Sequence, residues 1–228
     1  MRDKWWAKTL RIVGIVLMGL TAAFTIMGGA GTTCVALDPT GYAGKFSGIA
    51  PFQWLYILFV LVTIVIGVMG VRAVVLLVKG MKSAYRNSLI ALVAGTIVGG
   101  IHMAASRLLR GGSMPVDMVV YTTVLTLVVF LLFKLPGIWQ AINFEKPSGN
   151  DQMGRTAAAI VLAANGLLTL TIQFLMAPTH TIGGINYASV WHVTLSLLGV
   201  GLILVGVVIA INKPYSIPAL EAQAKAGR

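Results

Sequence analysis

The stretch that decides the fold is QWLYILFVLVTIVIGVMGVRAVVLLV, residues 53–78, in which the only charged residue is Arg72. A helix needs about 20 mostly apolar residues to cross the hydrocarbon core of a bilayer. Similar stretches occur at about 10–30, 87–106, 116–135, 156–177 and 188–211. The sequence therefore predicts an all-α, polytopic membrane bundle of six transmembrane helices.

The composition agrees with this fold class. Hydrophobic residues make up 57% of the chain, charged residues 10%, and the mean hydropathy is +0.90, whereas soluble domains carry about 25% charged residues. Six spans with short loops account for most of the 228 residues. We therefore expect one integral membrane domain, 1–228, and a multi-pass protein of the cell (inner or plasma) membrane.

The net charge of +11 does not indicate nucleic acid as a partner. A nucleic-acid footprint is a clustered basic patch, and here the basic residues mark the ends of the apolar stretches. Of the 17 Lys and Arg residues, all but Lys45, Arg107 and Arg110 would lie on the side that holds the N-terminus. Because cytoplasmic loops carry the excess of basic residues, both termini are predicted to be cytoplasmic.

Small residues recur at helical spacing and predict tight helix packing. Gly95 and Gly99 form a GxxxG pattern in the third span, and Gly199 and Gly206 lie on one face of the sixth. Such residues let the backbones of membrane helices approach closely. The fifth span adds a polar face of Asn165, Thr169 and Gln173.

The two histidines inside the spans are predicted to lie at one depth. His102 comes about four residues before the outer end of span three, and His192 about four residues after the outer start of span six. At a rise of 1.5 Å per residue, both would lie roughly 6 Å below the outer interface. Gln173 and Tyr121 fall at a similar level. Ionisable residues within spans are functional candidates, so this layer is the predicted site.

Three hypotheses account for this polar layer. In the first, His102 and His192 are the axial ligands of a b-type haem, and Arg107 and Arg110 pair with its propionates. Membrane cytochromes with two haems need four such histidines, so only a one-haem variant fits.

In the second, His102, Gln173, Tyr121 and His192 bind a quinone head group, because histidine exchanges protons near neutral pH. In the third, the histidines only form hydrogen bonds between helices. A metal site that adds His180, the histidine of the last outer loop, would also satisfy a three-histidine ligand count.

The long outer loop, 31–52, is the other candidate surface. Gly, Thr and the Asp38-Pro39 turn signal interrupt it, and four apolar residues could dock it on a partner or on the mouth of the bundle: Leu37, Tyr42, Phe46 and Ile49. The single cysteine, Cys34, is expected to be a thiol, because one cysteine cannot form an intrachain disulfide.

Several activities are not expected. All six carboxylates lie outside the spans or at their rims, whereas proton- and cation-coupled pumps use intramembrane acids. Motifs for phosphate binding or zinc hydrolysis are missing.

We therefore predict a small integral subunit of a larger, bioenergetic membrane complex without catalytic activity of its own. Its role would be structural, or it would carry electrons through a haem or quinone. The alternative is a small-solute permease or channel, which the similar loop lengths of the two halves suggest.

Overall fold

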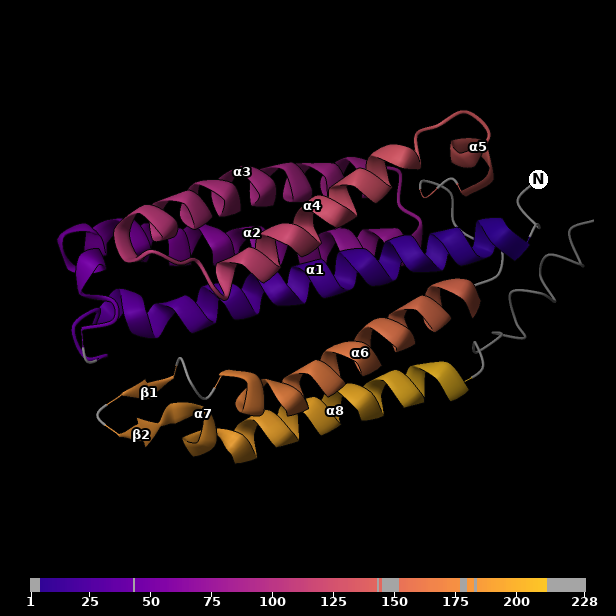
Figure 1. Cartoon of the computed structure of the whole chain (residues 1–228). Helices are drawn as coiled ribbons and strands as arrows, with labels where there is room; N and C mark the ends of the chain where they lie inside the picture. Colours follow the sequence, from indigo (N-terminus) through magenta and orange to yellow (C-terminus); the bar gives the residue numbers. More distant parts are fainter. Residues whose placement is uncertain are drawn as a thin grey trace, which may run out of the picture.

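The computed structural model describes residues 5–42, 44–142, 144, 152–176, 180–182 and 184–212. Figure 1 shows a bundle of long helices that run alongside one another. Five helices are long and apolar enough to cross a membrane: α1 (Trp5–Leu37), α2 (Gln53–Lys79), α3 (Ala84–Arg110), α6 (Gln152–Met176) and α8 (His192–Ile211). The all-α membrane bundle is thus confirmed.

The remaining predicted span is a shorter helix, α4 (Val116–Leu132), of 17 residues. At 1.5 Å per residue it measures about 25 Å, which is the lower end of the length that spans a bilayer. It packs against α1 and α3. Which end of the bundle faces the cytoplasm stays a prediction. We call the end formed by 38–52, 111–115 and 184–191 the outer end, after that prediction, and the opposite one the inner end.

Helices α1 to α4 form a ring in which each helix packs against its neighbours. Towards the inner end, their core is a cluster of apolar side chains that includes Ile15, Met18, Leu77, Leu92 and Phe130. The GxxxG face of α3 lies against α4, because a Cβ on Gly99 would come 2.9 Å from Val120. The predicted role of these glycines in close packing is confirmed.

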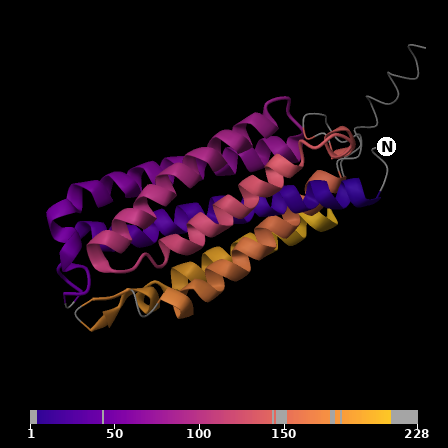
Figure 2. The same ribbon diagram turned by 45° about the horizontal axis from the view of Figure 1, so that its top comes forward.

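Helices α6 and α8 form a hairpin that lies along α1 (Figures 1 and 2). A Cβ on Gly199 of α8 would come 2.8 Å from the carbonyl oxygen of Gly166 on α6, so only glycine allows this approach. Gly206 likewise faces the carbonyl of Ala159. Helix α8 packs mainly on α6, on the far side of α1 from α3 (Figure 1).

The long outer loop is shorter than predicted, because α1 continues to Leu37. Thr32 and Thr33 extend it without a break, their hydroxyls donating to the carbonyls of Gly28 and Gly29 at 2.7 and 3.1 Å. The helix ends just before Asp38-Pro39, since a residue before proline is biased away from helix.

The rest of this loop docks on the bundle mouth. Tyr42, Phe46 and Ile49 are buried against Tyr56 and Val60 of α2. The short helix η1 (Ser47–Phe52) leads into α2. Three of the four predicted anchors are therefore buried, whereas Leu37 is exposed.

The inner end is closed by aromatic side chains. Around α5 (Ile138–Ile142), the Nζ of Lys134 lies 3.7 Å from the ring centre of Trp139. The buried Arg11 of α1 donates to the carbonyls of Ile142 and Leu77 at 3.4 and 3.5 Å.

At the outer end a two-stranded antiparallel ladder, β1 (Thr181–Ile182) and β2 (Ile185–Asn186), and the short helix α7 (Tyr187–Val190) precede α8.

Candidate functional site

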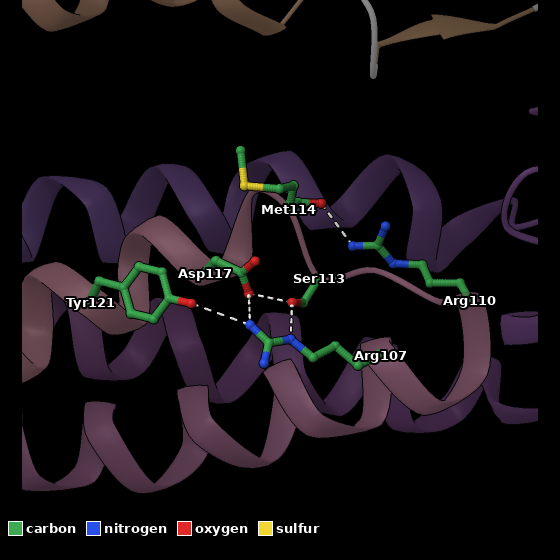
Figure 3. Close-up of polar contacts among 6 residues, drawn as sticks. All are labelled: Arg107, Arg110, Ser113, Met114, Asp117 and Tyr121. Carbon is green, nitrogen blue, oxygen red and sulfur yellow. Dashed lines mark hydrogen bonds and ion pairs between the residues drawn. The ribbon is translucent and has the colours of Figure 1, made fainter.

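The outer ends of α3 and α4 are joined by a polar cluster (Figure 3). Arg107 donates to Ser113 at 2.9 Å and to Tyr121 at 3.2 Å, and forms an ion pair with Asp117 at 3.4 Å. Ser113 also donates to Asp117. Two of the predicted site residues, Arg107 and Tyr121, are thus brought together. The charge of Arg107 is balanced by a carboxylate.

Arg110, one turn further along α3, has different surroundings. Its Nη2 donates to the carbonyl oxygen of Met114 at 2.7 Å (Figure 3). Its guanidinium carbon lies 5.3 Å from the ring centre of Phe46, in a cation–π contact. Gly111, at φ 71°, ends α3 directly after it and turns the chain towards α4.

His102 lies inside the ring of helices, where only 5% of its surface is exposed. Its imidazole stacks on Phe59 of α2, with 4.4 Å between ring centres and 17° between the planes. Tyr56 meets the same imidazole edge-on at 5.3 Å. These two rings fix the orientation of the histidine.

The Nε2 atom of His102 is buried and has no hydrogen-bond partner among the described residues. A buried polar atom without a partner costs about 1–3 kcal/mol, and such atoms are rare in folded proteins. Because none of the described residues satisfies this atom, the imidazole is available to a bound ligand.

Two small cavities border His102. The inner cavity lies deeper in the bundle, and its wall combines apolar side chains with hydroxyls and glycines, among them Thr25, Thr63, Thr123, Gly95 and Gly99. The outer cavity is lined by Thr32, Tyr56, Ser106, Arg110 and His180, together with Met114 and Pro115. His102 and Thr32 line both cavities and stand between them.

The volume within which the centre of a water molecule fits is about 20 Å³ in the inner cavity and about 30 Å³ in the outer one. About 10–15 Å³ on this scale suffices for one water molecule. Each cavity therefore admits one or two water-sized groups.

The hydroxyl pair of Tyr56 and Ser106 forms one wall of the outer cavity. Their oxygens lie 2.9 Å apart, and both side chains are buried. Tyr56 lies in a strongly apolar stretch, residues 53–78, and is not among the predicted site residues. It lies in the first turn of α2, at the depth of His102. This position could have identified it as a site residue.

The structure does not bring His192 to His102. His192 is exposed, its Nδ1 lies 2.8 Å from the carbonyl oxygen of Ser189, and its helix packs on α6. The histidine that shares a cavity with His102 is instead His180, whose ring lies against Gly31 of α1.

The other predicted ligands remain untested. Gln173 lies in α6, but its side chain falls outside the described residues. Within the described ranges, no group of three or more His, Cys, Asp or Glu side chains gathers as a metal site. Ligation of haem or of a metal by His102 and His192 stays a prediction.

Comparisons with protein-family models, with curated proteins and with solved structures found no match to this chain. The chain is a multi-pass membrane protein by its own helices, and its function has to be argued from the site alone.

Proposed function

We propose that this chain is a small integral membrane subunit that binds the head group of a quinone at His102, near the outer end of the bundle. The observation that carries the proposal is the buried Nε2 of His102, which lacks a partner and borders two cavities. A carbonyl oxygen of a quinone is an acceptor that an imidazole N–H can satisfy.

The size of the cavities favours a ligand of which only one polar group enters. A carbonyl fits where one or two waters fit, whereas the ring of the quinone would remain outside. Met114 and Pro115 line the outer cavity, and Met114 is exposed on the bundle surface. The ring would therefore lie at this opening, which a molecule dissolved in the bilayer can reach from the side.

A role in a larger complex follows from what quinone chemistry requires. Oxidation of a quinol releases two electrons and two protons, so a second redox centre has to take the electrons. We assign that centre to a partner subunit. Purification of the chain under mild conditions with partners in fixed stoichiometry would support this part of the proposal, and purification as a lone chain would count against it.

The binding part is tested by the quinone content of purified protein. The full chain, His102→Leu and His192→Leu are purified from the same membranes, and the bound quinone is extracted and quantified. We expect quinone to be retained by the full chain and by His192→Leu and to be lost from His102→Leu. Equal retention in both variants would contradict a site at His102.

A haem held by His102 and His192 is less favoured, because α3 and α8 lie on opposite sides of α1 (Figure 2). The two hypotheses differ in one simple measurement. A reduced-minus-oxidised absorption spectrum of the purified protein shows sharp bands for a six-coordinate b-type haem and none for a quinone site.

The permease hypothesis is favoured by one observation, the succession of two cavities from the outer end into the bundle. Threonine hydroxyls continue this path, since the Thr21 and Thr126 oxygens lie 2.7 Å apart. The apolar cluster around Met18 and Phe130 follows towards the inner end. Uptake of a small solute into vesicles that contain the full chain, blocked by Thr123→Phe, would favour a permease over a quinone-binding subunit.

A further inference from the structure

The outer cavity is lined mainly by apolar residues, and the charged or ionisable nitrogen groups in its wall are all basic. Arg110, His102 and His180 all contribute to it, and among the described residues no Asp or Glu lines either cavity. The remaining polar groups of the wall are hydroxyls, from Thr32, Tyr56 and Ser106. Such a wall offers donors and positive charge, which disfavours a cation and favours an anion or a neutral acceptor.

Among the described residues, no carboxylate lies within ion-pair distance of Arg110, because the nearby Asp117 is paired with Arg107. The partners of Arg110 among the described residues are the Met114 carbonyl, the Phe46 ring and the Tyr56 hydroxyl, all of them uncharged, and within the described part of the chain it forms no ion pair. Arg107 is the contrasting case, because its guanidinium is paired with Asp117 and it lines neither cavity. Two arginines three residues apart thus differ in whether a carboxylate neutralises them.

The imidazole supplies a second, independent indication of a ligand. His102 is buried, its Nε2 lacks a partner, and it borders the same cavity as Arg110. With about 30 Å³ open to water centres, this cavity is too small for a lipid phosphate group but suits a group the size of one or two waters.

We propose that the outer cavity binds a small monovalent anion of the halide class between Arg110 and His102. The inference rests on the same cavity as the proposed function, but it needs no quinone and no redox partner. The anion occupies the place that the quinone carbonyl takes, so the two ligands compete.

Chloride is the probe for the experiment. The full chain is purified in detergent without added lipid, and the line width of the chloride NMR signal is followed as chloride replaces gluconate at constant ionic strength. We expect saturable broadening with the full chain and with Arg107→Gln, the matched control. With Arg110→Gln, we expect binding to be about tenfold or more weaker, because a charge-assisted hydrogen bond is lost.

A second variant separates loss of the anion site from loss of the fold. Arg110→Lys keeps the charge, and we expect it to restore most of the broadening, whereas His102→Leu should reduce it. Absence of saturable broadening with the full chain, or undiminished broadening with Arg110→Gln, would overturn the inference. Broadening that appears only after an anionic lipid is added would overturn it too, because the signal would then come from the lipid surface.

The proposed function can fail separately. Addition of a short-chain quinone should displace the chloride and narrow the line. If the full chain binds chloride and quinone displaces none of it, the anion site stands, but quinone does not bind in the same cavity.

Discussion

The imidazole of His102 lies flat on the ring of Phe59, with 4.4 Å between their centres, while its Nε2 has no partner within the described structure. The histidine is thus fixed by packing and not by a hydrogen bond to Nε2. We expect this combination where a side chain binds a ligand. A histidine whose only role is to link helices would donate a hydrogen bond to a neighbouring helix.

His102→Leu should not lower the free energy of unfolding of the ligand-free protein by more than about 1 kcal/mol. Replacing a buried polar group that has no partner with an apolar group of similar size is nearly neutral. Tyr85→Phe is the contrasting variant, because the Tyr85 hydroxyl donates to the Phe130 carbonyl at 2.7 Å, and we expect a loss of about 1 kcal/mol. Both are measured by unfolding in a mixed detergent series. A loss of more than about 2 kcal/mol for His102→Leu would show that the chain itself supplies a partner.

Gly199→Val should separate α8 from α6, whereas Gly201→Val should leave the hairpin intact. A side chain at Gly199 would meet Leu170 at 2.7 Å and the backbone of Gly166 at 2.8 Å, but at Gly201 it would meet no atom within 4 Å. Overpacking of this kind costs about 1–3 kcal/mol. Thermal unfolding of the two variants compares the same substitution two positions apart on one helix, and equal stabilities would refute the packing described for this hairpin.

The docked outer loop should loosen at high pH. Burial, with smaller contributions from Cys34 and Asp38, raises the pKa of Tyr42 to about 12 from an ordinary value of 10.0. Because the folded state favours the neutral phenol, its contribution to stability is complete below about pH 10 and is lost as the pH rises from 10 towards 12. We expect this loss in the full chain and not in Tyr42→Phe, as measured by unfolding at each pH and by phenolate absorbance. The same decline in Tyr42→Phe would assign the pH dependence to another group.

The orientation of the bundle can be tested with single cysteines. After Cys34→Ala, the exposed residues Lys45 at the outer end and Lys82 at the inner end are replaced one at a time. An impermeant maleimide added to intact cells should label Lys45→Cys and spare Lys82→Cys, since the distribution of basic residues predicts the second to be cytoplasmic. The reverse labelling pattern would show that the bundle has the opposite orientation in the membrane.

The helices could be predicted from the sequence because each apolar stretch by itself meets the length that a bilayer requires. Their ends were less accurate. The glycines and threonines after Ala30 predict a loop, yet the Thr32 and Thr33 hydroxyls bond back to the helix, which extends to Leu37.

The site was predicted in part. Counting residues from the end of a span gives an expected depth, but it depends on where the helix ends: α3 continues for eight residues beyond His102, whereas α8 begins at His192 itself. Depth does not give the order of helices around the bundle, so the pairing of these histidines could not be tested in advance. The cavity partner of His102, His180, lies outside the spans, where hydropathy carries no information on position.

The most direct test of the account is the nitrogen NMR spectrum of the three histidines, labelled in the full chain and assigned with His102→Leu and His192→Leu. We expect a short-chain quinone to move the Nε2 signal of His102 and to leave both signals of His192 in place. A His102 signal that stays unchanged at saturating quinone, or that moves no more than the signals of His192, would contradict a ligand site at His102.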